Sequence, residues 1–367
     1  MSVSVVIAGG GTGGHLYPGI AVARELLARV PDAQVTLVGT AAGIEARVIP
    51  REGLTLALIR SAGLKGKSIP ALLRGLLLLP LSAIDAWRVL SRYRPSVVVG
   101  VGGYSSGPVV ALAALRGIPT MVMEQNATPG LTNRLLARLV RAAAVTYEQS
   151  LAQFGGKAFV SGNPVRLGFF ERTSVGADEP SGSGQADVTR VLVFGGSQGA
   201  HAINAAMVDA APYLARGGVR LAITHQTGER DLEAVRQGYA RAGIAGRVEA
   251  FLFEMDREMT GADLIVCRAG ATTLAELTAA GKPSILVPLP TATDDHQRRN
   301  AAALASQGAA RTLDERELSG ERLAAEIVAL ASDREAREQM AAAAGRLARP
   351  DAARVIVDRM LELSRPW

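Results

Sequence analysis

The sequence predicts an α/β protein with two doubly wound domains of similar plan, and three observations lead to this prediction. Short runs of Val, Ile and Leu recur without polar alternation, as expected of strands buried on both faces of a parallel sheet. Each run is followed by a glycine-rich turn and a helix-like stretch, which is the order of a βαβ unit. Two such turns lie in each half of the 367-residue chain, a length that suits two domains.

Four junctions between a strand and its turn define this plan in chain order. They occupy residues 3–8 and 9–14, 97–101 and 102–107, 191–194 and 195–199, and 264–266 and 267–271. The chain has 40 glycines, about 11% against a usual ~7%. Because many of them cluster at these junctions, they indicate tight backbone turns rather than a flexible chain.

The boundary between the two domains is visible as a change in composition. Residues 171–189 are rich in Gly, Ser, Pro and Asp and lack hydrophobic periodicity, so we expect a loop or linker there. The preceding stretch, Ser161–Arg166, suits a hinge. We therefore place the domains at residues 1–163 and 164–349. Residues 351–363 carry apolar side chains at helical spacing and predict a closing helix that packs on either domain.

Composition excludes several classes of protein. Apolar residues make up 48% of the chain and charged residues 20%, which provides a sizeable core and argues against disorder. A single cysteine, Cys267, excludes an intrachain disulfide framework and a cysteine-based zinc site. The chain start lacks signal-peptide features, and the apolar stretch 69–81 is too short and too interrupted to span a bilayer. The net charge of +6 permits an anionic partner without identifying one, and we expect a soluble cytoplasmic protein.

The first turn, Gly9–Gly14, matches the pattern G-x-G-x-x-G, which holds anions at helix N-termini. A nicotinamide site also needs an acidic residue at the end of the second strand. Residues 35–40 end without one and Glu45 lies several residues beyond, which disfavours a dehydrogenase. His15 follows the turn, where a helix N-terminus favours a neutral imidazole that can act as a general base. The alternative, that His15 only caps the helix or bonds a local carbonyl, stays open.

The fourth turn allows two interpretations of one carboxylate. Gly270–Thr273 opens a helix, and the spacing of Thr273 and Glu276 fits a capping box in which Glu276 returns a hydrogen bond to the cap. Alternatively, the amides of the helix start meet a diphosphate and Glu276 accepts hydrogen bonds from vicinal hydroxyls, such as those of a ribose. The residues alone leave both interpretations open.

Further polar segments follow the other predicted strands. The third turn, 195–199, offers amides and a hydroxyl to a phosphate, and Arg166 is either a fixed positive charge or an ordinary surface arginine. Segments 122–127 and 288–300 place carboxamides at strand ends, which suits hydroxyl-rich ligands. The pair Asp294–Asp295 lacks a third ligand, so we expect solvated loop residues rather than a metal site.

Residues 65–92 combine basic side chains with Ile, Leu and Trp. An amphipathic helix that packs on the sheet explains this pattern, and so does a surface that docks on an anionic bilayer. The basic residues are Lys65, Lys67, Arg74, Arg88 and Arg92.

Taken together, these motifs resemble the MurG family of bacterial N-acetylglucosaminyltransferases. The resemblance covers nearly the whole chain and keeps the family's order. The matching segments are Gly9–His15 with Pro18–Gly19, Gly102–Pro108, Glu124–Asn126 with Gly130–Asn133, Gly162–Arg166, Gly195–Gly199, and Cys267–Ala271 with Glu276. Each segment is a weak signal alone, whereas their joint order is highly specific.

The resemblance implies a GT-B architecture, in which two Rossmann-like domains face a cleft and residues 350–367 pack back on the first domain. It implies transfer of GlcNAc from UDP-GlcNAc to the C4 hydroxyl of the muramoyl sugar of lipid I, with inversion, giving lipid II and UDP. Such a displacement needs a base at the acceptor and stabilisation of the leaving diphosphate. The family's location implies a peripheral protein on the cytoplasmic face of the membrane, with residues 65–92 as the anionic-membrane patch and no nucleic-acid partner.

The resemblance also implies roles for individual residues by matching position. His15 stands where the family places its proposed catalytic base. The residues implied in donor binding are Thr12, Gly13, Gly14, Asn126, Arg166, Ser197, Leu252, Ala271, Thr272, Thr273, Leu274, Ala275, Glu276 and Gln297. The backbone of Leu252 is expected to face uracil, and the ribose role is favoured for Glu276. No cofactor or metal is expected, since helix dipoles and side chains can stabilise the diphosphate.

Two positions depart from the family pattern. Met123 stands where many members have histidine, and His296 stands where some have glutamine. These departures concern acceptor handling and sugar contacts rather than the reaction class. Two other functions stay open at this point: a UDP-GlcNAc 2-epimerase of similar plan, and a membrane-docked nucleotide-binding protein without turnover.

Overall fold

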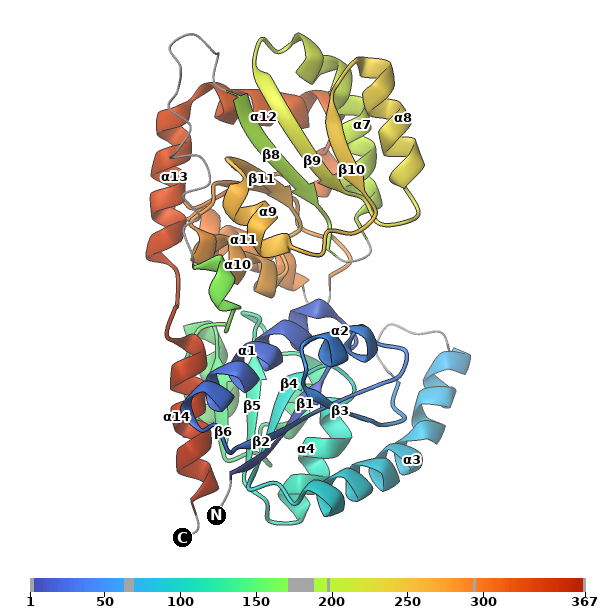
Figure 1. Ribbon diagram of the computed structural model, residues 1–367, viewed down its shortest axis with the longest axis vertical. Coiled ribbons are helices and arrows are strands. Elements are labelled where there is room, and N and C mark those ends of the chain that lie inside the picture. Colours follow the sequence, from blue (N-terminus) through green and yellow to red (C-terminus); the bar gives the residue numbers. More distant parts are fainter. Residues whose placement is uncertain (1–2, 63–68, 171–187, 197–198, 293–294, 366–367) are drawn as a thin grey trace. The chain divides into compact units, whose positions relative to one another are not determined.

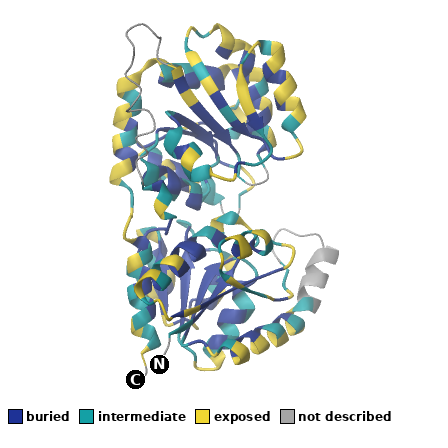
Figure 2. Cartoon of the chain, in the orientation of Figure 1, coloured by how far each residue is buried: buried dark blue, intermediate teal, exposed yellow. Residues whose placement is uncertain are grey.

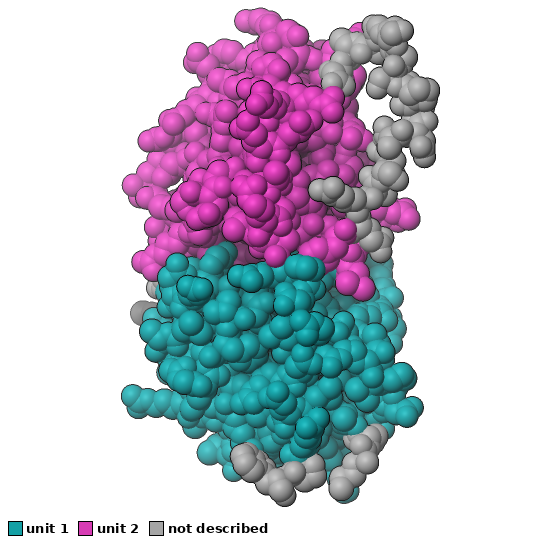
Figure 3. Space-filling view, turned by 90° about the vertical axis from the view of Figure 1, so that its left-hand side faces the viewer, with its two compact units in different colours: residues 1–166, 349–367 teal, residues 167–348 magenta. Residues whose placement is uncertain are grey.

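The computed structural model describes residues 3–62, 69–170, 188–196, 199–292 and 295–365 (Figure 1). The chain forms two compact units, which Figure 3 distinguishes by colour. Unit 1 comprises residues 1–166 and 349–367, and unit 2 comprises residues 167–348. These boundaries lie within three residues of the domain limits expected from the sequence. Most of the expected linker lies outside the described residues, and its last two positions already belong to a strand.

Unit 1 contains a parallel sheet of seven strands in the order β3-β2-β1-β4-β5-β6-β7. The strands are β1 (Ser4–Gly9), β2 (Gln34–Gly39), β3 (Thr55–Leu58), β4 (Val97–Gly102), β5 (Thr120–Glu124), β6 (Ala142–Val145) and β7 (Ala158–Val160). The helices are α1 (Gly13–Arg29), α2 (Glu45–Arg51), α3 (Ile69–Tyr93), α4 (Ser106–Leu115), α5 (Leu131–Leu136), α6 (Leu151–Phe154) and α14 (Ala352–Ser364).

Unit 2 contains a parallel sheet of six strands in the order β10-β9-β8-β11-β12-β13. The strands are β8 (Val188–Phe194), β9 (Arg220–Gln226), β10 (Gly246–Glu249), β11 (Leu264–Cys267), β12 (Ser284–Leu286) and β13 (Arg311–Thr312). The helices are α7 (His201–Arg216), α8 (Leu232–Ala242), α9 (Met255–Gly261), α10 (Ala271–Ala280), α11 (His296–Ala305), α12 (Gly320–Ser332) and α13 (Arg334–Arg346).

Helices cover both faces of each sheet, which explains the unbroken apolar runs of the strands. In β1, Val5 and Ile7 belong to one buried cluster, whereas Val6 and Ala8 belong to another. The central strands are accordingly buried along their length (Figure 2). The predicted α/β class with two doubly wound parallel sheets is confirmed.

The C-terminal helix α14 packs in unit 1. It lies against α1, and its side chains Ile356, Val357 and Met360 are buried in the same cluster as Leu16 and Ile20 of α1. The end of the chain therefore completes the core of the unit in which the chain begins. Among the described residues, no helix is both long enough and apolar enough to cross a membrane.

Candidate active site

The candidate residues lie at the carboxyl ends of parallel strands, where the strand order of each sheet reverses. That point lies between β1 and β4 in unit 1, and between β8 and β11 in unit 2. Ligands of open α/β sheets bind outside such switch points. The turns Gly9–Gly14 and Gly102–Gly107 flank the switch point of unit 1, and Gly195–Gly199 and Arg268–Ala271 flank that of unit 2.

The first turn of unit 1 places His15 close to the end of β4. Helix α1 begins at Gly13 with Thr12 as its N-cap residue, and Thr12 Oγ1 lies 3.1 Å from His15 Nδ1. A Cβ atom at Gly102 would lie only 2.6 Å from His15 Cδ2. Gly102 also has a φ of +97°, so both the space and the backbone conformation require glycine. His15 itself is half-buried, which leaves part of the imidazole exposed.

Glu45 folds back onto the first turn from the helix that follows β2. Its side chain is completely buried. It accepts hydrogen bonds from the Gly11 and Thr40 amides at 2.9 and 2.8 Å, and from the Thr40 hydroxyl at 3.1 Å. An internal carboxylate therefore occupies the position beside Gly11 where a glycine turn would hold an anionic ligand.

Glu124 fixes the loop that carries Asn126. It is the last residue of β5 and is buried. Its Oε1 accepts from the Asn126 amide and side chain at 3.0 and 3.2 Å, and its Oε2 accepts from Gly130 and Asn133 at 3.0 and 2.8 Å. Burial raises the pKa of Glu124, although these four donors act in the opposite direction. Two of the four bonds hold Asn126 at the strand end, and the other two tie Gly130 and Asn133 to the same carboxyl group.

Two other positions in unit 1 acquire a physical explanation. Arg166 belongs to unit 1, not to the second domain as expected, and its guanidinium carbon lies 4.9 Å from the ring centroid of Tyr17 on α1. This stacking places a positive charge beside the helix that carries His15.

The Met123 side chain is buried in the core of unit 1, so it has no access to a substrate at the strand ends.

In unit 2, the third turn packs closely against the loop after β9. Ser197 lies outside the described residues. Gly199 has a φ of +75°, and a Cβ atom there would lie 1.8 Å from the carbonyl oxygen of Thr227. Glycine is therefore required where the two loops meet.

The fourth turn leads directly into α10, which begins at Ala271. Gly270 is its N-cap residue, and no side chain caps the helix start. The capping-box interpretation is wrong, because Thr273 is the third residue of the helix rather than its cap. Glu276 is mostly buried, and burial together with its nearby charge raises the pKa of the Cys267 thiol. The predicted segment Ala271–Glu276 thus forms the first turns of the helix beside β11.

Leu252 and Gln297 are both engaged in loop contacts. The Leu252 amide donates to Gln226 Oε1 at 2.7 Å. The Oε1 atom of Gln297 accepts from the Ala269 and Leu289 amides at 3.3 and 3.0 Å, which joins the loops after β11 and β12. The predicted site residues that the structure describes are divided between the two units. Unit 1 carries Thr12, Gly13, Gly14, His15, Asn126 and Arg166, and unit 2 carries Leu252, Ala271–Glu276 and Gln297.

Comparison with known families accounts for both units. Residues 5–145 match the model of the glycosyltransferase family 28 N-terminal domain, and residues 190–356 match that of the family 28 C-terminal domain. The chain belongs to glycosyltransferase family 28. It is an enzyme of the GT-B fold class.

Named relatives place this glycosyltransferase among MurG proteins. It is 51% identical over 98% of its length, and 93% of the relative's, to the UDP-N-acetylglucosamine–N-acetylmuramyl-(pentapeptide) pyrophosphoryl-undecaprenol N-acetylglucosamine transferase of Anaeromyxobacter sp. strain K. The crystal structure of Acinetobacter baumannii MurG matches with a TM-score of 0.75 and 31% identity over 98% and 99% of the two chains. A UDP-GlcNAc 2-epimerase from Neisseria meningitidis matches with a TM-score of 0.69 over 99% and 100% of the chains but at 14% identity, which shows a shared fold alone.

A buried polar network lies next to the third turn of the transferase. His225, on β9, pairs through Nδ1 with the Tyr239 hydroxyl at 2.8 Å and through Nε2 with Asn204 Oδ1 at 3.1 Å. Asn204, on α7, donates to the Thr227 carbonyl oxygen and to Asp231, at 2.9 and 2.8 Å. The network joins α7, α8 and the end of β9, the elements that surround Gly199.

His225 predicts an acid-sensitive free energy of unfolding. Burial lowers the pKa of His225 to about 3, against about 6.5 in an unfolded chain. As the pH falls from 7 to 5, the unfolded state therefore binds a proton that the folded state does not. We expect this histidine to cost about 2 kcal/mol of stability over that interval. Urea unfolding at both pH values measures the loss.

The controls for this experiment are two histidine variants. His225→Gln removes the titration and should shrink the difference between pH 7 and pH 5 by about 2 kcal/mol. His201→Gln alters an exposed histidine paired with Asp231 and should leave most of the difference intact. An unchanged pH dependence in His225→Gln contradicts the assignment.

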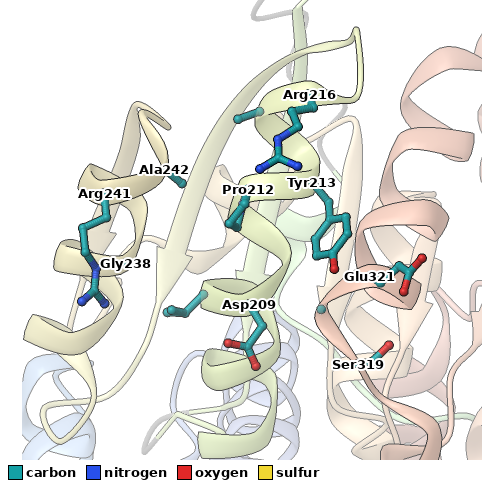
Figure 4. Close-up of a pocket in the computed structure, with 12 residues that line it drawn as sticks. Asp209, Pro212, Tyr213, Arg216, Gly238, Arg241, Ala242, Ser319 and Glu321 are labelled. Atoms are coloured by element: carbon teal, nitrogen blue, oxygen red, sulfur yellow. The ribbon is translucent and has the colours of Figure 1, made fainter.

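A pocket of about 650 Å³ in unit 2 lies away from the switch point. It is bounded by the second half of α7, the end of α8 and the start of α12. Figure 4 shows Asp209, Tyr213 and Arg216 along α7, with Arg241 on α8 and Glu321 on α12. None of the predicted site residues belongs to the lining of this pocket. The pocket is thus separate from the candidate site.

Three supporting residues of the transferase could not be identified from the sequence. Glu45, Asn204 and Gln226 act through contacts with residues 20 or more positions away, and no local motif marks them. Across the described residues, no cluster of three His, Cys, Asp or Glu side chains is arranged to hold a metal ion.

Proposed function

We propose that this enzyme transfers GlcNAc from UDP-GlcNAc to the C4 hydroxyl of the muramoyl sugar of lipid I, and so makes lipid II for peptidoglycan. The supporting observation is the 51% identity, over nearly the whole chain, to a relative named for this transfer. The glycine turns and polar side chains at both switch points are consistent with it.

In this proposal, unit 2 binds the donor. The amides at the start of α10 face the diphosphate, because a helix N-terminus without a side-chain cap favours an anion. Glu276 accepts hydrogen bonds from the ribose hydroxyls. We also propose that no resident metal is needed, since helix amides and polar side chains stabilise the departing UDP.

In unit 1, His15 acts as the general base. His15 Nδ1 lies 3.1 Å from Thr12 Oγ1. In the tautomer that this role requires, Nδ1 donates to that hydroxyl and Nε2 accepts the proton of the acceptor's C4 hydroxyl. The hydroxyl oxygen forms a bond to C1 of GlcNAc while the bond from C1 to the UDP oxygen breaks, and the electron pair leaves with UDP. One such displacement inverts the anomeric carbon, from the α-linked donor to a β-linked product.

The decisive experiment supplies UDP-GlcNAc with and without a lipid I analogue, in a buffer that contains EDTA. We expect UDP release and a disaccharide product only when both substrates are present. Formation of UDP-ManNAc from the donor alone would instead identify an epimerase. Binding of UDP without any product would identify a non-catalytic nucleotide-binding protein.

We further propose that α3 docks the enzyme on the anionic cytoplasmic face of the membrane. Ala86, Val89 and Leu90 of this helix are buried, whereas Ile84 and Trp87 are 46% and 52% exposed. The guanidinium of Arg116 lies 4.5 Å from the Trp87 ring, and Arg88 is exposed nearby. Exposed apolar groups edged by cations suit a bilayer surface. The side chains of residues 63–77, including Leu76 and Leu77, lie outside the described residues.

A double variant tests this docking surface. Ile84→Gln with Trp87→Gln should weaken binding to vesicles that contain anionic lipid by about tenfold. The reason is that two apolar side chains are no longer transferred from water into the bilayer surface. The thermal unfolding temperature should stay the same, since both side chains are exposed. Tyr213→Gln on unit 2, where Tyr213 is 47% exposed, is the matched control. A loss of stability in the double variant, or unchanged vesicle binding, contradicts the proposal.

A further inference from the structure

The side chain of Gln226 connects two loops that are distant in sequence. Gln226 is the last residue of β9 and is 2% exposed. Its Nε2 donates to the carbonyl oxygen of Gly196 at 2.9 Å, and its Oε1 accepts from the Leu252 amide at 2.7 Å. One buried carboxamide thus uses its donor on one loop and its acceptor on the other.

The position of β9 in the sheet makes this connection possible. β9 lies between β8 and β10. Gly196 follows β8, and Leu252 lies in the loop after β10. A side chain at the end of the middle strand therefore reaches the loops on both sides. Because amide and carbonyl groups of a carboxamide are about 2 Å apart and rigidly joined, the two bonds fix the separation of the loops.

We propose that Gln226 is the positioning residue that holds two backbone segments, Gly195–Gly196 after β8 and the segment at Leu252, at the separation a uridine diphosphate requires. This inference rests on the proposed function, in which unit 2 binds UDP-GlcNAc, and adds two contacts to it. The backbone after β8 contacts the diphosphate beside the start of α10, and the Leu252 loop contacts the base. The Nε2 and Oε1 atoms of Gln226 are both used in bonds to backbone groups, so Gln226 is not proposed to contact UDP. It acts by holding the two backbone segments at a spacing at which one nucleotide can contact both.

This role predicts an unequal effect on the nucleotide and its fragments. Gln226→Met keeps the length of the side chain and removes both hydrogen bonds. Each loop can still adjust to uridine alone or to inorganic pyrophosphate alone, so those affinities should change by less than about threefold. UDP contacts both loops at once, so its affinity depends on their spacing. Its affinity should fall about tenfold or more, because the variant no longer holds the two loops at that spacing before UDP binds.

The experiment measures binding of UDP, uridine and inorganic pyrophosphate to the full chain, by calorimetry or by displacement of a fluorescent nucleotide. Gln237→Met is the matched control, because Gln237 is an exposed carboxamide on α8 whose side chain donates to the exposed Glu233 one turn away. Thermal unfolding of every variant accompanies the titrations. Equal losses for UDP and for both fragments would show a merely structural role, and unchanged UDP binding would overturn the proposal directly.

A second variant covers the case in which Gln226→Met does not fold. Gln226→Leu also removes both hydrogen bonds, and its apolar side chain suits a buried position. Uridine and pyrophosphate affinities should again change by less than about threefold, while UDP affinity falls about tenfold or more. Equal losses for all three ligands would contradict positioning. Failure of the wild-type protein to bind UDP would instead refute the proposed function.

Discussion

Replacing His15 by alanine lowers turnover by a factor of about 10²–10⁴, the usual contribution of a general base, while the affinity for UDP stays the same. The physical reason is the placement of the imidazole, which contacts Thr12 through Nδ1 and lies over Gly102 at the switch point of unit 1. UDP binding is assigned to unit 2, so it does not depend on this side chain. Steady-state kinetics with a lipid I analogue and calorimetry with UDP measure the two quantities.

His201→Ala is the matched control for this experiment. His201 is also located at a helix start, but on α7 of unit 2, where it pairs with Asp231. We expect its turnover to remain within about threefold of wild type, because it is not proposed to touch the acceptor. If His15→Ala turns over at the wild-type rate, His15 is not the base. If it loses UDP affinity as well, His15 contributes to donor binding.

Replacing Glu276 by alanine weakens UDP binding about 30- to 150-fold. Hydrogen bonds to a charged group contribute about 1.5–3 kcal/mol, and a loss of 2–3 kcal/mol corresponds to this range. The carboxylate belongs to α10 rather than to a capping box at its start. It is also mostly buried, which limits competition from water.

Binding of 2′-deoxy-UDP distinguishes the loss of a ribose contact from a general defect in unit 2. The wild type should prefer UDP over 2′-deoxy-UDP, and Glu276→Ala should bind both equally. Glu335→Ala, which changes an exposed glutamate on α13, should keep the preference. A variant that still distinguishes the two nucleotides would remove Glu276 from the ribose.

The order of strands and turns could be predicted from the sequence because each apolar run and its glycine turn are local features. Continuous burial of β4 on both faces is encoded in the uninterrupted Val97–Val101 run. The same local logic located the turns that carry His15 and Ala271. The extent of α10 was harder to predict, because Thr273 and Glu276 satisfy the capping-box spacing even inside a helix.

The supporting contacts could not be predicted, because they depend on how the strands are paired. Gln226 reaches Gly196 and Leu252 only because β9 lies between β8 and β10. Arg166 was expected in the second domain, yet its stacking on Tyr17 ties it to the first. Residue type alone did not show that the Met123 side chain points into the core.

The carboxylate of Glu45 has a consequence for inhibitor chemistry. Both units have similar glycine-turn architecture, but in the first turn of unit 1 the Gly11 amide already donates to a side chain of the protein, the carboxyl group of Glu45. A ligand phosphate at this turn should therefore bind through groups other than the Gly11 amide. Inhibitors aimed at the first turn should be designed around that occupied donor, whereas those aimed at the start of α10 can use helix amides that no side chain caps.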